Sequence, residues 1–194
     1  AFDVLSMGVG SDGTSGFPLV ACYLTGAELK AAAEVDASVT PLMPAAQLYM
    51  AGLEYSFNTH RMFFNRVTDI RLVQENRRTE PAPILGDSSQ LESSGYQYMV
   101  PQTDRTYSEL EDGQLYRVVT GMYSAQMLGT VKSKSLGLLS LEPKLADGTP
   151  VTDFEACILR DENGSEIKEW YALAAYLRQY GEAGLPECYA RPDG

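Results

Sequence analysis

The side chains that could do chemistry are few and scattered. His60 is the only histidine of the 194 residues, and Cys22, Cys157 and Cys188 show no CxxC spacing. Zinc sites need clustered Cys and His, and a general base needs a carboxylate and a reacting group nearby. The sequence also lacks a GxSxG elbow and a P-loop. We therefore predict no catalytic residues and no metal site in this chain, and interpret His60 as a surface histidine.

A cluster of acidic residues and the many tyrosines could each bind a ligand. Glu109, Glu111 and Asp112 cluster near a turn, but their oxygen spacing matches no EF-hand-like pattern. We prefer a solvated acidic turn to a calcium or magnesium site. The twelve tyrosines could offer stacking faces to a base. Most of them follow strand periodicity, where core packing explains them without a ligand.

Five arginines fall close together in an otherwise acidic chain. They could hold a phosphate or an acidic neighbouring domain. The alternative is that the strand arginines pair with strand neighbours and that the last two decorate a loop. We favour this second interpretation, because exposed ion pairs contribute little. The residues are Arg61, Arg66, Arg71, Arg77 and Arg78.

Composition and charge narrow the classes of function. The chain has 44% hydrophobic and 21% charged residues, which is typical of one globular domain. The net charge is −11, so binding to nucleic acid is not expected, whereas a single nucleotide stays possible. No apolar stretch is long enough for a membrane span. Cys22 and Cys157 lie in apolar runs, and we predict buried free thiols rather than a disulfide.

The clearest local signal is an abrupt change from strand to helix. Residues 17–24 read as an apolar strand interior to a sheet. Thr25 and Glu28 have the spacing of a capping box, which would start a helix at once. The helix should bury Leu29, Ala32 and Ala33 and leave Lys30 and Glu34 outside.

The other predicted elements complete an α+β pattern. Residues 52–58 alternate, with Leu53, Tyr55 and Phe57 inward, and should pair antiparallel with a strand at 66–73. We expect a single domain, with a mixed or antiparallel sheet flanked by helices. Further expectations are a loop at 74–95, strands at 115–128, 136–144 and 149–160, and a helix at 166–180.

Several segments, in order, resemble the C-terminal domain of the 5'-nucleotidase family, which includes UDP-sugar hydrolases and 2',3'-cyclic-nucleotide phosphodiesterases. "PLVACYLTGAELKAAAE" (18–34) is similar to the family's "V-x-L-x-G-x-x-L-K-x-A-x-E" segment. "MAGLEYSFN" (50–58) and "NRVTDIRL" (65–72) look like its paired strands. "AFDVLSMGVG" (1–10) and "LYRVVTGMYSAQML" (115–128) resemble two more of its segments, and "SLGLLSLEPKLADGTPV" (135–151) resembles a variant in bacterial bifunctional nucleotidases.

The resemblance implies a division of labour between two domains. This chain would be the substrate-binding domain, with a core over about residues 1–145 and an extension over about 146–194. An N-terminal metallophosphoesterase domain, absent from this chain, would hold two divalent metals and hydrolyse phosphate esters of nucleotides. The parent protein would be bacterial and extracellular or in the cell envelope, and this chain alone would not be catalytic. The alternative is a structural or interaction domain that supports the metallophosphatase domain without binding a ligand.

The resemblance also implies where the substrate binds. The family places the base between two aromatic rings, one from an "F-x-Q-V-S-G" stretch and one from "G-G-D-G-F". Gln47 takes the first aromatic position here, and Tyr49, two residues on, is the candidate replacement. Gly129 survives from the second motif, but Val131 stands where its aromatic belongs. The predicted substrate-binding residues are therefore Gln47, Tyr49, Gly129 and Val131.

Overall fold

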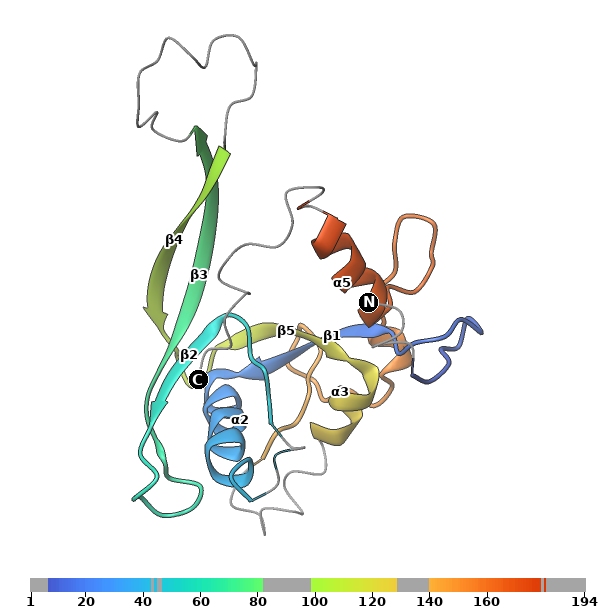
Figure 1. Cartoon of the computed structure of the whole chain (residues 1–194). Coiled ribbons are helices and arrows are strands. Elements are labelled where there is room, and N and C mark those ends of the chain that lie inside the picture. The colour runs from blue at the N-terminus through green and yellow to red at the C-terminus, as the bar shows by residue number, and fades with distance from the viewer. Residues whose placement is uncertain are drawn as a thin grey trace, which may run out of the picture. The chain divides into compact units, whose positions relative to one another are not determined.

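The computed structural model has helices and two antiparallel sheets, which confirms the predicted α+β class (Figure 1). It describes residues 7–42, 44, 47–81, 99–128, 140–178 and 180, with side chains at 75–81 and 99–103 left out. Two compact units form, unit 1 from Ala1–Ala32 and Asp112–Gly194 and unit 2 from Ala33–Glu111. The elements are β1 (Leu19–Thr25), α2 (Gly26–Val39), β2 (Leu53–Phe57), β3 (Val67–Pro81), β4 (Met99–Glu109), β5 (Leu115–Gly121), α3 (Met122–Leu128), the 3-10 helix η3 (Glu155–Cys157) and α5 (Glu169–Arg178).

Strand β1 is bonded along both edges, as predicted for an interior strand. One edge pairs antiparallel with β5, which lies beside it in Figure 1. On the other edge, Tyr23 exchanges two backbone hydrogen bonds of 2.8 and 2.9 Å with Lys144. The amide of Leu19 donates to the carbonyl of Ile167, and its own carbonyl accepts from Leu159, both at 2.8 Å. Three later segments of unit 1 therefore meet at this strand.

The predicted capping box is confirmed at the start of α2. The amide of Glu28 donates to Thr25 Oγ1 at 3.2 Å, and the amide of Thr25 donates to Glu28 Oε2 at 2.8 Å. The other oxygen, Glu28 Oε1, accepts from Lys144 Nζ at 2.5 Å and from the amide of Glu142 at 3.1 Å. Burial alone would raise the pKa of Glu28, but these hydrogen bonds lower it below its ordinary value. One carboxylate thus caps the helix and anchors a distant loop. The predicted buried positions of the helix, Leu29, Ala32 and Ala33, are also confirmed.

The core of unit 1 includes a helix where a strand was expected. The prediction of a strand over 115–128 is wrong beyond Gly121, where β5 ends and α3 begins. The amide of Met122 donates to the carbonyl of Pro18 at 2.9 Å, and the chain turns into α3. The side chain of Glu169 also occupies the space that a Cβ at Gly121 would need. The core cluster consists of Val20, Met122, Ala125, Cys157 and Ile158, with Val151 and Phe154 packed against it.

The other elements predicted near the C-terminus are corrected too. Within the described residues, 140–144 and 149–160 form isolated bridges and η3 rather than the predicted strands. Residues 166–168 are extended, since Glu166 bridges to Arg160 and Lys168 bridges to Pro18. Helix α5 therefore begins at Glu169 instead of residue 166, and it ends at Arg178.

Unit 2 contains a three-stranded antiparallel sheet in the order β2–β3–β4. The predicted pairing of 52–58 with 66–73 is confirmed, and Leu53 lies opposite Leu72. The predicted loop at 74–95 is wrong over 74–81, because β3 continues there against β4; residues 82–95 lie outside the described ranges. Phe57 is 49% exposed rather than inward, since the register shifts between Ser56 and Phe57.

Two carboxylates of α2 hold the loops of unit 2. Glu34, predicted to face outward, accepts the amides of Arg66 and Val67, each at 2.8 Å. Asp36 accepts the amide of Leu48 at 2.8 Å and the hydroxyl of Tyr55. Burial and this carboxylate raise the pKa of Tyr55. Glu34 and Asp36 therefore accept hydrogen bonds from loop amides, in place of the backbone carbonyls that would bind these amides in a regular helix or sheet.

The capping box is expected to contribute measurably to stability. Thr25→Ala removes the acceptor of the Glu28 amide and should lower the free energy of unfolding by about 1 kcal/mol. Thr152→Ala, in an exposed loop of the same unit, is the control and should change it little. Urea unfolding followed by circular dichroism measures both, and equal effects of the two variants would contradict this role.

Candidate functional site

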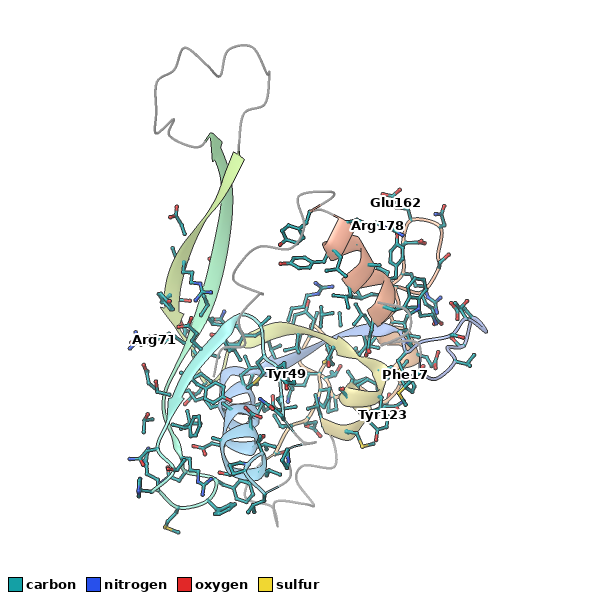
Figure 2. All side chains as sticks on the ribbon, in the orientation of Figure 1. Phe17, Tyr49, Arg71, Tyr123, Glu162 and Arg178 are labelled. Carbon is teal, nitrogen blue, oxygen red and sulfur yellow. The ribbon has the colours of Figure 1, made fainter. Side chains whose placement is uncertain are left out.

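Two of the four residues predicted to bind substrate lie together. Gln47 and Tyr49 follow α2 in unit 2, and the hydroxyl of Tyr49 donates to Gln47 Oε1 at 3.2 Å. Tyr49, labelled in Figure 2, is 87% exposed, so its ring is open to a stacking partner. Gly129 and Val131 lie outside the described residues. The structure therefore brings together one half of the predicted site.

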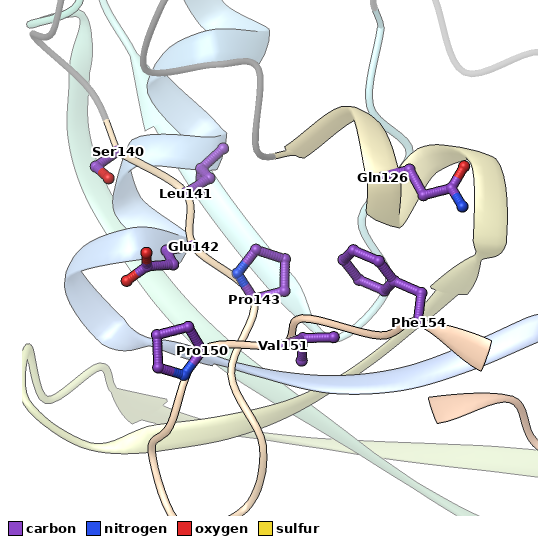
Figure 3. Close-up of a pocket in the computed structure, with 8 residues that line it drawn as sticks. All are labelled: Gln126, Ser140, Leu141, Glu142, Pro143, Pro150, Val151 and Phe154. Carbon is purple, nitrogen blue, oxygen red and sulfur yellow. The ribbon is translucent and has the colours of Figure 1, made fainter. Parts of the chain in front are cut away.

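Unit 1 contains a pocket that the sequence did not predict. Its volume is about 290 Å³. The rings of Phe154 and Pro143 point toward one another in Figure 3. Gln126 comes from α3, and the other lining residues come from the loop segments 140–143 and 150–154. Among the residues that the structure describes, the lining is Gln126, Ser140, Leu141, Glu142, Pro143, Pro150, Val151 and Phe154.

A tight hairpin forms one wall of this pocket. The amide of Val151 donates to the carbonyl of Pro143 at 2.8 Å, and the amide of Leu145 donates to the carbonyl of Thr149 at the same distance. Asp147 accepts the amide of Thr149 at 2.9 Å, and Gly148 supplies the left-handed conformation of the turn with a φ of 86°. The turn residues are "ADG" (146–148), and Asp followed by Gly is typical of such a turn. The sequence did not indicate that the flanking prolines would line a pocket.

A buried charged cluster lies elsewhere in unit 1. Lys168 Nζ is 2.5 Å from Glu166 Oε2 and 2.8 Å from Asp12 Oδ1, and the side chains of Lys168 and Glu166 are 2% and 0% exposed. The hydroxyl of Ser11 donates to Glu166 Oε1 at 2.5 Å. A Cβ at Gly10 would overlap the ends of the Lys168 and Glu166 side chains, so a larger residue there would displace this ion pair. The cluster fastens residues 10–12 to the extended segment before α5.

This cluster is suited to stability rather than to catalysis. Burial alone would lower the pKa of Lys168, but its hydrogen bonds with Asp12 and Glu166 raise it. The amine therefore stays protonated at neutral pH, and a protonated amine is not a nucleophile. Sequence analysis missed this cluster, because Lys168 is far from Asp12 in the chain and lies in a run that reads as helix.

The cysteines and the histidine have the environments predicted for them. His60 is exposed. Cys22 and Cys157 are buried free thiols, and burial raises the pKa of Cys22 to about 11. Thiols in this state are poor nucleophiles, whereas Cys188 lies outside the described residues. Within the described ranges, no group of three or more His, Cys, Asp or Glu side chains could hold a metal ion.

The charged residues singled out in the sequence are mostly engaged in contacts. Asp112 pairs with Lys30 at 2.5 Å, and Arg71 pairs with Asp69 of its own strand at 2.7 Å. Arg66 differs from the prediction, because it donates to the carbonyl of Ala37 at the end of α2 and stacks on a neighbouring phenylalanine ring. Residues 77–78 lie on β3 instead of in a loop. The predicted pairing of arginines with strand neighbours therefore holds for Arg71 and is wrong for Arg66.

No family model, curated protein or solved structure matches the chain. The resemblance to the 5'-nucleotidase family therefore stays a prediction carried by segments of the sequence. The α+β class follows from the helices and antiparallel sheets themselves. None of the helices in the described ranges has the length and apolar character that a bilayer crossing requires.

Removal of the buried amine should destabilise the chain strongly. Lys168→Met removes the cation at 2.5 Å from the buried Glu166 and leaves the more distant Arg160 at 3.7 Å. We expect a loss of about 3–5 kcal/mol in the free energy of unfolding. Lys30→Met breaks an exposed pair and is the matched control, with an expected loss of less than about 1 kcal/mol. Urea denaturation gives both values. If both variants lose a similar amount of unfolding free energy, the burial of the Lys168–Glu166 pair does not explain its contribution to stability.

The charged cluster around Lys168 also predicts how the stability of the chain changes at acidic pH. The hydrogen bond from Lys168 lowers the pKa of Asp12; for Glu166, burial raises the pKa, but the bonds from Lys168 and Ser11 outweigh it. The stabilisation is therefore present above the ordinary carboxyl pKa and is lost as the pH falls through the lowered values. Urea midpoints at about pH 7 and about pH 3 should differ more for the unmodified chain than for Lys168→Met. An equal pH dependence would contradict the assignment.

Proposed function

We propose that this chain is the substrate-binding domain of a bacterial 5'-nucleotidase-like metallophosphatase. It would bind the nucleoside part of a nucleotide, while a separate metallophosphoesterase domain hydrolyses the phosphate ester. The observation that carries the proposal is the ordered set of family-like segments over residues 1–130 of the sequence. The exposed ring of Tyr49 and the ring-lined pocket of unit 1 support it, because nucleosides are bound by stacking and by a few polar contacts.

In this proposal, substrate binding and hydrolysis belong to two different domains. A dinuclear site needs a cluster of His and carboxylate ligands, which we assign with its two divalent metals to the partner domain. The net charge of −11 favours contact with the uncharged end of a nucleotide over its phosphates. We expect the parent protein outside the cell or in the cell envelope. The alternative is a structural or interaction domain that supports the metallophosphatase domain without a ligand of its own.

Calorimetry distinguishes the two functions. Titration of the full chain with adenosine, AMP and a UDP-sugar should show saturable binding in the micromolar range to at least one of them. The absence of binding to all three would favour the structural or interaction domain. A phosphatase assay with added divalent metals should show no turnover, and clear turnover would contradict the assignment of hydrolysis to a separate domain.

A further inference from the structure

We propose that the connection between β2 and β3 in unit 2 binds the surface of an anionic lipid bilayer. This connection spans residues 58–66, and we call it, together with Leu42 just after α2, the tip of unit 2. Met62 and Phe63 would enter the headgroup region of the bilayer, and the guanidinium of Arg61 would contact lipid phosphates. Such binding needs no helix across the bilayer, and it does not depend on the proposed nucleotide site.

The apolar side chains of the tip protrude from the protein. Met62 is 80% exposed, Leu42 is 74% exposed and Phe63 is 47% exposed. An apolar peptide is bound by a groove, whereas protruding side chains line no groove. They suit a soft phase that closes around them, such as the boundary between headgroups and acyl chains. Their transfer out of water into this boundary would stabilise the bound state.

Contacts with α2 fix the loop that carries these side chains. The amide of Phe64 donates to the hydroxyl of Ser38 at 2.9 Å, and the guanidinium of Arg66 donates to the carbonyl of Ala37 at 3.0 Å. Phe64 has a φ of 58°, a conformation that is rare for a bulky residue and persists only where the surroundings impose it. Figure 1 shows the connection beside the C-terminal end of α2. The apolar side chains are therefore already in place before they meet a surface.

The charge of the tip is opposite to that of the whole chain. The net charge is −11, yet residues 55–68 contain no Asp or Glu and include His60, Arg61 and Arg66. Anionic headgroups attract such cations near the bilayer surface. Physiological salt screens charges beyond about 8 Å, so distant carboxylates of the chain oppose this attraction little. The tip is therefore the part of unit 2 that complements an anionic bilayer.

The charge of Arg61 is available to a lipid phosphate. Among the described residues, its guanidinium donates only to neutral oxygens, at 3.1 and 3.3 Å. Two carboxylates that border the tip have other partners. Both oxygens of Glu34 accept backbone amides at the base of the loop, and Asp69 pairs with Arg71 at 2.7 Å.

Sedimentation of the full chain with lipid vesicles tests this proposal. The chain should bind vesicles of equimolar phosphatidylglycerol and phosphatidylcholine, and should bind vesicles of phosphatidylcholine alone more weakly. Met62→Asp should weaken binding by about tenfold or more, because a carboxylate replaces an apolar side chain at the tip. Met7→Asp is the matched control, since Met7 is 77% exposed in unit 1, and it should bind like the unmodified chain.

A second pair of variants separates charge from insertion. Arg61→Gln should weaken binding about fivefold, as expected for one cation near the surface. Arg117→Gln, exposed on β5, is its control and should have no effect. Met62→Trp should keep binding, and its fluorescence should shift to shorter wavelength on vesicles, whereas that of Met7→Trp should not. Thermal unfolding confirms that each variant is folded.

Three outcomes would overturn the proposal. The first is that the unmodified chain stays in solution with both kinds of vesicle, and the second is that Met62→Asp and Met7→Asp bind equally well. The third is that inorganic phosphate displaces the chain from vesicles at constant ionic strength, which would indicate a site for free phosphate instead of a bilayer. Each of these outcomes leaves the proposed function standing, because nucleoside binding by calorimetry is measured without vesicles.

Discussion

The hydrogen bonding of β1 on both edges is the constraint on which unit 1 depends. The strand has alternate side chains fully buried, so its backbone groups need partners inside the protein. Strand β5 supplies them on one edge, and the segments around residues 144, 158 and 167 supply them on the other. These segments are distant from one another in the chain. Their convergence on one strand brings the hairpin at 143–151 next to the core and forms the wall of the pocket.

Ion pairs and charged hydrogen bonds also stabilise the contacts between these segments, because many of the buried apolar side chains are small. Much of the buried set consists of alanine and cysteine, whose burial stabilises less than that of larger side chains. Glu28 caps α2 and binds both the amide of Glu142 and the amine of Lys144. Lys168 fastens the N-terminal segment to the start of α5 in a similar way. The same contacts that stabilise the fold thus also position Glu142 at the pocket.

The buried lysine and the buried thiols of unit 1 are held in their protonated forms by their surroundings. A protonated buried lysine and buried thiols of raised pKa offer no nucleophile. These three buried groups therefore serve the packing and the stability of unit 1.

The sequence by itself determined the local elements. The capping box of Thr25 and Glu28, the antiparallel pair β2–β3 and the buried thiols follow from spacing and polarity, which act between near neighbours. Only the tertiary structure decided that the chain enters α3 after Gly121, that β3 continues to Pro81 against β4, and that Glu34 turns inward to bind two amides. It also decided the pocket and the Lys168 cluster. Their members are up to 156 residues apart, and no periodicity along the chain reports which distant side chains will meet.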